Sequence, residues 1–363
     1  MRLNCEKYFE RDDEMEKSKS LHELVWLCQK IGRKIDYVQG GGGNISVKLD
    51  SRYMAIKASG FRLDQVTEDD GYVIVDYEKI KSFFESVNLS LVKDYEKESL
   101  EVAQKSVLSF PGRVLRPSVE VGFHSILDRY VIHSHSVYAN ILACSHEGKQ
   151  LCYQIFKDEN FNFIWIPYIN PGFSLTVKIA DELMSLSAED KKTKVIFMEN
   201  HGLIVSSNNL KEVYEVHERV NLLIKRWFKI RGRYPSAVLK QIGNNKYQSR
   251  TRFILDFIKS ESFEIDFFER YPLYPDQLVY INSNLYTENP KIELNPQKGC
   301  VVYNANYSEA LAIEETLLAY LYVITKISKL GLTMKTMSED ETEYIKNWES
   351  EKYRKELLKK MAK

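Results

Sequence analysis

Four residues have types and positions that could do chemistry: His133, His135, His201 and Glu120. His133 and His135 lie two apart in the segment RYVIHSHSVYA, which begins as an apolar strand. Because side chains alternate along a strand, both imidazoles point to the same face. His201 follows the strand-like run KVIFMEN. Three imidazoles from two strand ends are typical of a divalent-metal site that keeps one position open for substrate, so a catalytic metal is favoured over a cysteine-rich structural one.

A core role is the competing explanation for any single histidine, and a His-x-His pair also occurs by chance. His201 strengthens the metal hypothesis because it ends a strand and is followed at once by a glycine. We expect His217 in the core, on the apolar face of a helix, and His22 and His146 on the surface. His124, one helical turn after the glutamate, could support the site or lie on the helix surface.

The composition excludes several classes of protein. Lysine plus arginine and aspartate plus glutamate balance at 51 each in 363 residues, so no global positive charge indicates binding to nucleic acid. A hydrophobic fraction of 44% is typical of a folded protein with a large core or two domains.

Targeting signals are not evident either. The amino-terminal segment MRLNCEKYFERDDEMEK is densely charged and has no apolar stretch of signal-peptide length. The most apolar long segment, ALAIEETLLAYLYVITKI, carries two glutamates and a lysine, which predicts a buried helix rather than a membrane span. Five cysteines without a CxxC pair are typical of reduced thiols. We therefore expect a cytoplasmic protein that does not bind membranes.

Periodicity indicates the elements that must position the four residues, in an α/β or α+β fold. A turn of four glycines, residues 40–43, precedes the strand NISVK and then the histidine strand. Further strands are predicted at 53–58, 72–77, 162–168, KVIFME and GLIVSS. Helices are predicted at 20–33, within 79–110, after Pro117, at 174–186 and at 210–230.

The carboxy-terminal part is predicted to form a separate unit. The basic, turn-rich stretch RGRYPSAVLKQIGNNKYQSRTR suggests a boundary, which we place between residues 1–235 and 236–363. Beyond it, DQLVYIN and GCVVYNA are strand-like and two helices follow. Ser338, with Glu341 three residues later, has the spacing of a capping box at the start of the last helix.

Five short motifs occur in order along the chain: GGGNIS, IKASG, PSVE, HSH and NHG. With them, residues 15–235 resemble the class II aldolase/adducin family, which includes L-fuculose-phosphate and L-rhamnulose-phosphate aldolases and L-ribulose-phosphate 4-epimerase. The run RPSVE…FHSIL…RYVIHSHS is most similar to the aldolase part of bifunctional rhamnulose-phosphate aldolase/dehydrogenases. YPDQLVYI and IKNWESEKYRKE also resemble that branch, although no dehydrogenase domain is expected here.

The resemblance implies a three-layer α/β/α fold with a mostly antiparallel central sheet, a smaller α+β carboxy-terminal region, and a homotetramer with sites near subunit interfaces. The matched histidines His133, His135 and His201 would bind Zn²⁺, although Co²⁺, Mn²⁺ or Fe²⁺ also suit such ligands. Glu120 matches the acid/base glutamate. The positions that would hold a substrate phosphate are matched by Gly43, Asn44, Ser59, Gly60 and Ser118.

The implied reaction is reversible cleavage of a phosphorylated ketose into dihydroxyacetone phosphate and an aldehyde. A divalent metal would act as a Lewis acid for the enediolate, and a carboxylate would move the proton. The glycine turn could approach a phosphate closely, or could be a turn without a ligand. A 4-epimerase or a decarboxylase/dehydratase of the same family is the alternative. A non-catalytic adducin-like scaffold is disfavoured because all three histidines and Glu120 are present.

The chain also departs from the family pattern. Val119 replaces a second serine of the short aldolases, and Lys57, beside the same pocket, could supply positive charge instead. The segment 61–116 is longer than in those enzymes, so we expect an elaboration over the site. Tyr168, in IPYINPG, could protonate the leaving aldehyde or could be a core tyrosine. The sequence does not define the sugar.

Overall fold

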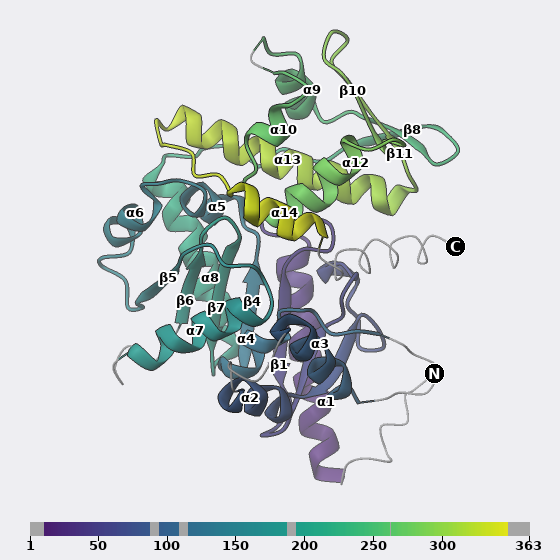
Figure 1. The fold of residues 1–363 in the computed structure, drawn as a ribbon. Coiled ribbons are helices and arrows are strands. Elements are labelled where there is room, and N and C mark those ends of the chain that lie inside the picture. The colour runs from purple at the N-terminus through teal and green to yellow at the C-terminus, as the bar shows by residue number, and fades with distance from the viewer. Residues whose placement is uncertain (1–10, 88–93, 109–114, 187–193, 262, 348–363) are drawn as a thin grey trace.

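The computed structural model describes residues 11–87, 94–108, 115–186, 194–261 and 263–347. A large mixed sheet with helices on both faces forms the first part of the chain, and a smaller α+β region covers one end of that sheet (Figure 1). The α/β architecture with a smaller carboxy-terminal α+β region is therefore confirmed.

The large sheet has seven strands in the order β3-β2-β1-β4-β7-β6-β5. All neighbours pair antiparallel except β5 and β6, which are parallel. The strands are β1 (Asn44–Lys48), β2 (Tyr53–Lys57), β3 (Tyr72–Asp76), β4 (Tyr130–Ser134), β5 (Phe163–Ile166), β6 (Lys194–Met198) and β7 (Gly202–Ser207). The mostly antiparallel sheet thus agrees with the prediction, and β4, which carries the first histidine, lies at its centre.

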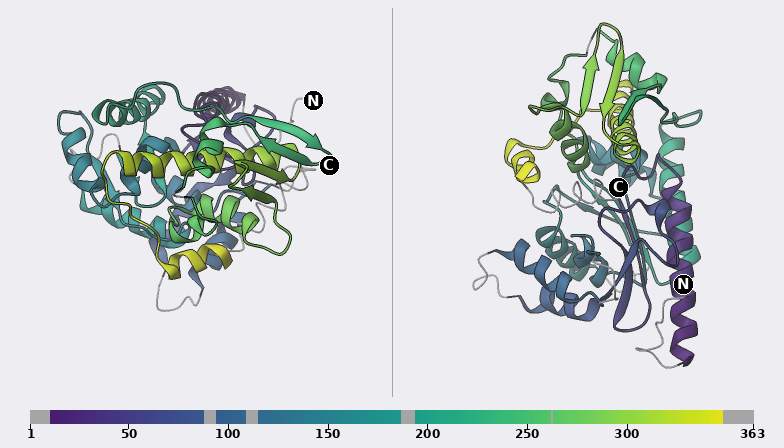
Figure 2. Two further views of the ribbon diagram at one scale, coloured as in Figure 1. Left: turned by 90° about the horizontal axis from the view of Figure 1, so that it is seen from above. Right: turned by 90° about the vertical axis from the view of Figure 1, so that its right-hand side faces the viewer.

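Alternate residues of the strands pack into separate hydrophobic cores on the two faces of the large sheet. On β4, Ile132 packs with helices α1 (Arg11–Gly32), α5 (Val137–Ala143), α6 (Gly148–Ile155) and α8 (Leu210–Trp227). Val131 packs on the opposite face with α4 (Val121–Ile126) and α7 (Phe173–Ser185). On that face α2 (Tyr77–Ser86) and α3 (Tyr95–Lys105) cover β2 and β3. The right-hand view of Figure 2 shows α1 and the α2–α3 pair on opposite sides of the sheet.

The first helix is longer than the sequence predicted. Among the described residues it already runs from Arg11 rather than from near residue 20, because the charged segment before the apolar positions gives no apolar periodicity. Within the predicted elaboration 61–116, the described residues form the short 3₁₀ turn η2 (Leu63–Gln65), β3, α2 and α3.

The smaller region contains a four-stranded antiparallel sheet in the order β10-β11-β9-β8. Its strands are β8 (Leu239–Gly243), β9 (Lys246–Ser249), β10 (Ile292–Asn295) and β11 (Cys300–Asn304). The turn-rich stretch after residue 231 therefore contains a β-hairpin, closed at Asn245 with φ of 47°. GCVVYNA does contain a strand, as predicted. The boundary near residue 236 stays a prediction.

The prediction of a strand in DQLVYIN was wrong. The segment is helical: α11 (Pro275–Gln277) leads into a π-helical turn, η3 (Leu278–Asn282), and then α12 (Ser283–Leu285). Every residue of η3 is buried, so its apolar run has no helical periodicity and cannot be told from a buried strand by pattern. Pro275 at the first helical position is the signal that favoured a helix.

The remaining helices are α9 (Arg252–Ile258), α10 (Phe267–Arg270), α13 (Tyr307–Lys329) and α14 (Glu339–Asn347). The apolar segment ALAIEETLLAYLYVITKI lies in α13, which is buried along most of its length. Across the described residues, no helix is long and apolar enough to span a membrane. The predicted capping box starts α14: the Ser338 amide donates to Glu341 Oε2 (2.7 Å) and the Glu341 amide to Ser338 Oγ (3.3 Å). Most of IKNWESEKYRKE, from residue 348, lies outside the described residues.

Candidate metal centre

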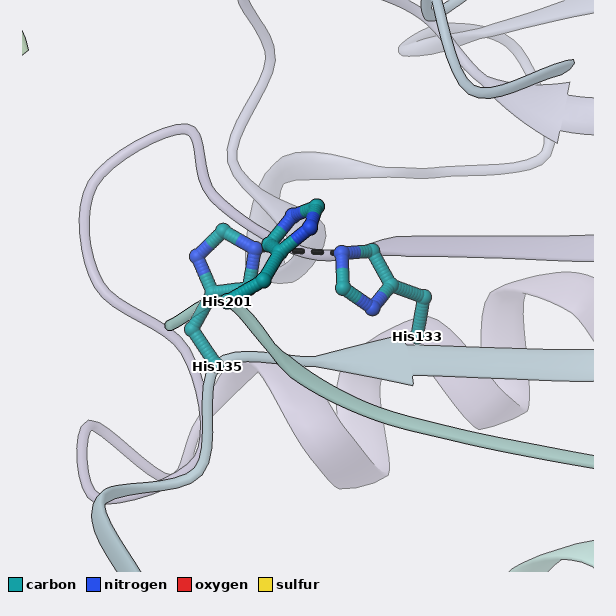
Figure 3. A group of neighbouring side chains, drawn as sticks. All are labelled: His133, His135 and His201. Carbon is teal, nitrogen blue, oxygen red and sulfur yellow. Dashed lines mark hydrogen bonds between the residues drawn. The ribbon is translucent and has the colours of Figure 1, made fainter. Parts of the chain in front are cut away.

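Three buried imidazoles converge at the end of β4. His133 lies on the strand and His135 just beyond its last residue, on the same face, while His201 lies in the turn between β6 and β7 (Figure 3). Because β7 pairs with β4, that turn lies beside the His133–His135 pair. One nitrogen from each ring lies within 4.8 Å of the other two, a spacing that a single metal ion can bridge.

Hydrogen bonds define which nitrogens face inward. Nδ1 of His133 lies 3.2 Å from the carbonyl oxygen of Leu203, which can only accept, so this nitrogen carries the proton. Nδ1 of His135 likewise donates to the carboxylate of Asp276 at 2.5 Å. In neutral rings both Nε2 atoms then carry lone pairs, yet they lie 3.1 Å apart. A cation between the rings would relieve this repulsion, so the donor set fits a metal.

Glu120 completes the cluster. Its Oε1 lies 3.4 Å from Nε2 of His133 and 3.2 Å from Nε2 of His201. It occupies the N-cap position of α4 but makes no capping bond with its side chain, which leaves the carboxylate directed at the histidines. Burial raises the pKa of the Glu120 carboxyl, but positive charge at His133 and His201 lowers it more strongly, so this pKa lies well below its ordinary range. A bound cation would supply that positive charge while the imidazoles stay neutral.

Burial also keeps His201 neutral. It lowers the pKa of this imidazole to about 4, although Glu120 raises it in part. A neutral imidazole is the form that binds a metal. Nδ1 of His201 has no hydrogen-bond partner among the described residues, unlike Nδ1 of the other two rings.

The other histidines lie apart from this cluster. His217 is fully buried on α8 and contacts Ser134 Oγ at 2.7 Å, in agreement with the predicted core role. His124 is also fully buried, at 2.7 Å from Ser46 Oγ, so the helix-surface alternative was wrong. Helix α4 has too few residues to reveal its buried face by pattern. His22 and His146 are exposed, as expected.

Two residues of the predicted phosphate site line one cavity, which ends at the residue before Glu120 in the chain. Ser59 and Ser118 line a space of about 290 Å³, together with Arg116 and with Lys97 from α3. The Ser118 hydroxyl accepts the amide hydrogen of Glu120 at 3.3 Å. Lys97 belongs to α3, so this helix forms one wall of the cavity. That residues 61–116 are an elaboration over the site stays a prediction.

The glycine turn lies nearer the histidines. Asn44 is opposite His133 in the sheet, and its buried Oδ1 has no partner among the described atoms. Gly43 and Gly60 adopt left-handed φ values of 68° and 86°. At Gly43 a Cβ atom would lie 2.7 Å from Val38 and 2.9 Å from the His133 carbonyl oxygen, so this position requires glycine.

Most amides of that turn already have acceptors within the protein. Gly40 donates to Glu315 (3.0 Å), Gly41 to the hydroxyl of Tyr280 (3.2 Å), and Gly42 to the carbonyl of residue 39 (2.9 Å). Lys57 is buried and donates to the carbonyls of Gly41 and of residue 61, at 3.1 and 2.8 Å. These contacts stabilise the turn itself, so the cavity at Ser59 and Ser118 is the more open place for an anion.

Tyr168 lies at the edge of the smaller region. Its ring packs against the apolar cluster that includes Leu278 and Tyr280, and its buried hydroxyl has no described hydrogen-bond partner. Burial, with Glu341 and Tyr344 nearby, raises the pKa of the phenol. A neutral phenol can donate a proton, so the role of acid stays a prediction for Tyr168.

Sequence reasoning missed three residues that contact the site from the carboxy-terminal region: Asp276, Tyr280 and Glu315. Their segments contain no motif with recognisable chemistry. The available signal was YPDQLVYI, which contains Asp276 and Tyr280 and resembles the same branch of the family as the histidine segment.

Two curated relatives each match more than half of the chain. A Bacillus subtilis protein described as "Uncharacterized oxidoreductase YuxG" is 25% identical over 206 residues, which are 54% of this chain and 28% of that protein. The 3-oxo-tetronate 4-phosphate decarboxylase of Haemophilus influenzae is 24% identical over 225 residues, or 57% of this chain and 87% of that enzyme. The match thus covers little more than a quarter of the first relative and most of the second.

Solved structures superpose on about three fifths of the chain. The N-terminal class II aldolase domain of a conserved protein from Thermoplasma acidophilum is 23% identical, with a TM-score of 0.48, and covers 62% of this chain and 99% of its own. The L-fuculose-1-phosphate aldolase of Thermus thermophilus is 14% identical, with a TM-score of 0.37, and covers 59% and 99%.

A sequence profile of the family described as "Class II Aldolase and Adducin N-terminal domain" matches residues 22–227. The match covers more than half of the 363 residues and includes all three histidines and Glu120. The chain belongs to the class II aldolase/adducin family.

Proposed function

We propose that this protein is a metal-dependent aldolase that cleaves a phosphorylated ketose reversibly into dihydroxyacetone phosphate and an aldehyde. The observation that carries the proposal is the position of the Glu120 carboxylate, within 3.4 Å of two of three converging imidazoles in a buried site. That arrangement joins a set of metal ligands to a group that can move a proton, and both are needed to break a carbon–carbon bond beside a ketone.

His133, His135 and His201 would hold the ion. Three imidazoles suit Zn²⁺ first and also accept other first-row divalent metals. When bound, the metal supplies a Lewis acid that polarises a carbonyl oxygen. All three rings are buried, and the lower local dielectric strengthens the electrostatic interactions within the site.

Glu120 would transfer the proton. Its carboxylate lies within 3.4 Å of two of the imidazoles, so it would accept a proton from a substrate hydroxyl or carbon beside the metal and return it later. The contact between Ser118 and the Glu120 amide fixes the start of α4 and therefore the position from which the carboxylate acts.

The cavity at Ser59 and Ser118 would bind the phosphate end of the substrate. Arg116 and Lys97 line this cavity, with Glu101 as the one acidic residue among its lining residues, and would supply the positive charge that a dianion needs. They would take over the role of the hydroxyl that Val119 does not provide, and Val119 lines the same cavity.

Decarboxylation of a sugar-acid phosphate is the second candidate, favoured by the match across 87% of the 3-oxo-tetronate 4-phosphate decarboxylase. Loss of CO₂ from a 3-oxo acid and retro-aldol cleavage both leave an electron pair on a carbon beside a ketone. The same metal ligands and the same carboxylate could therefore serve either reaction, and the departing group distinguishes them.

A product assay tests both candidates. Metal-loaded protein is incubated with L-rhamnulose 1-phosphate, L-fuculose 1-phosphate and 3-oxo-tetronate 4-phosphate, with and without chelator. Dihydroxyacetone phosphate with an equal amount of aldehyde, abolished by chelator, supports the aldolase. Release of CO₂ from 3-oxo-tetronate 4-phosphate, without cleavage of either ketose phosphate, supports the decarboxylase instead of the aldolase. If none of the three substrates gives a product, both candidate functions are contradicted.

A further inference from the structure

The carboxy-terminal region contacts three segments at the candidate metal centre. Figure 1 shows its helices over the end of the large sheet at which β4 terminates. Contacts from this region reach the turn of four glycines, His135 after β4, and the β6–β7 turn that carries His201.

The contact with His135 is the most direct. Asp276, on α11, accepts the Nδ1 hydrogen of His135 at 2.5 Å, and both side chains are at least nine-tenths buried. A carboxylate in this position fixes the tautomer so that Nε2 keeps its lone pair, holds the ring plane, and makes the imidazole a stronger donor to a metal. Because Nδ1 carries only one hydrogen, the carboxylate of Asp276 decides the orientation of this ring.

The glycine turn is shaped around this pair. A Cβ atom on Gly42 would lie 2.6 Å from Asp276 Oδ2 and 2.8 Å from His135 Nδ1. Any other residue at this position must displace either the carboxylate or the imidazole. Because Gly42 has no side chain, Asp276 on α11 can approach His135 closely enough to accept its hydrogen bond.

The turn that carries His201 is held from the same region. Asn200 adopts a left-handed φ of 51°, and its Nδ2 donates to the carbonyls of Leu273 (2.8 Å) and Lys335 (2.7 Å). Lys335 in turn pairs with Glu199 at 2.5 Å. These bonds stabilise a conformation that non-glycine residues rarely adopt, and they set where the next residue, His201, projects.

We propose that Asp276 is a positioning residue for His135 and that the carboxy-terminal region thereby completes the metal centre. The inference rests on the metal-binding part of the proposed function and is independent of which bond the enzyme breaks. It assigns a role to a region that carries no recognisable catalytic motif.

The experiment measures metal affinity in the full chain. Asp276→Asn keeps the size of the side chain and an oxygen acceptor but removes its charge, and Asp256→Asn, at an exposed ion pair on α9, is the matched control. Zn²⁺ affinity is determined by competition with a chromophoric chelator, and the visible absorption of the Co²⁺ form reports the ligand field. We expect Asp276→Asn to bind Zn²⁺ about tenfold to hundredfold more weakly with an altered Co²⁺ spectrum, and Asp256→Asn to match the wild type.

Gly42→Ala supplies a second variant, which keeps the aspartate at position 276 but disturbs its contact with His135. It should weaken metal binding through the same contact, so its effect and that of Asp276→Asn should be less than multiplicative in the double variant. Unchanged Zn²⁺ affinity and an unchanged Co²⁺ spectrum in Asp276→Asn would overturn the inference, as would fully multiplicative losses. If the wild-type protein binds no metal, both the proposed function and this inference fail. If the wild type binds metal and Asp276→Asn binds it equally well, only the inference about Asp276 fails.

Discussion

Glu120 Oε1 lies 3.2 Å from Nε2 of His201, on the inward side of the imidazole cluster. The carboxylate thus reaches the space into which the metal-binding nitrogens point without belonging to the set of three imidazoles. Glu120 is therefore placed to exchange a proton with a substrate bound to the metal, whereas the three histidines hold the metal.

Glu120→Gln should retain metal and lose most of its turnover. Glutamine has nearly the same shape but cannot accept a proton, so kcat should fall about 10²- to 10⁴-fold. Metal content and kcat are measured on the same preparation, with the exposed Glu98→Gln on α3 as a control. Turnover close to that of the wild type in Glu120→Gln would refute the assigned role.

His133→Ala should lose metal and activity together. The ring contributes one of three nitrogens, and two imidazoles without the third leave an incomplete set of protein ligands. Metal content by elemental analysis and product release are the readouts, and His146→Ala, at an exposed histidine, is the control. A full equivalent of tightly bound metal in His133→Ala would show that the ligands lie elsewhere.

Arg116→Gln should weaken binding of phosphorylated substrates selectively. Loss of one charge-assisted hydrogen bond is worth about 1.5–3 kcal/mol, so KM should rise roughly tenfold or more for the phosphorylated ketose. Turnover of the unphosphorylated ketose should not change, since it has no group for the cavity to hold. Equal effects on both substrates would place the phosphate outside the Ser59–Ser118 cavity.

Acid should destabilise the protein partly through His217. Burial lowers the pKa of this ring to about 3, while in the unfolded chain it titrates near about 6.5. The unfolded state therefore takes up a proton that the folded state does not. The stability that depends on the neutral ring is complete above about pH 6.5 and is lost as the pH falls toward 3.

The loss from this one group is about 1.4 kcal/mol at roughly pH 5.5. Urea denaturation at about pH 8 and about pH 5.5 measures it in the wild type and in His217→Gln, and the difference between the two proteins isolates this ring because all others are shared. An equal pH dependence in both proteins would show that His217 is protonated in the folded state.

The histidine cluster could be predicted because its positions depend on short stretches of sequence. A two-residue spacing on a strand fixes a shared face for His133 and His135, and the β6–β7 turn that holds His201 follows from two clear strand patterns. The central antiparallel sheet was likewise predictable from its family resemblance and from strands with ordinary apolar patterns.

The contribution of the carboxy-terminal region was not predictable in this way. Asp276 reaches His135 only because α11 packs on the end of the sheet, and no periodicity encodes that docking. The buried run from Leu278 was mistaken for a strand for a related reason, since a segment buried on all sides has no polar face to reveal its period. The role of Lys57 as a donor to two backbone carbonyls also depends on contacts that spacing does not specify.

The most direct test of the account is a metal titration of the stripped wild-type protein beside a His133→Ala/His135→Ala/His201→Ala variant. We predict one tightly bound Zn²⁺ or Co²⁺ per wild-type chain, with activity restored in proportion to the metal added, and neither in the variant. Product release by metal-free protein, or an equal stoichiometry in the variant, would contradict the central claim that these three histidines hold a catalytic metal.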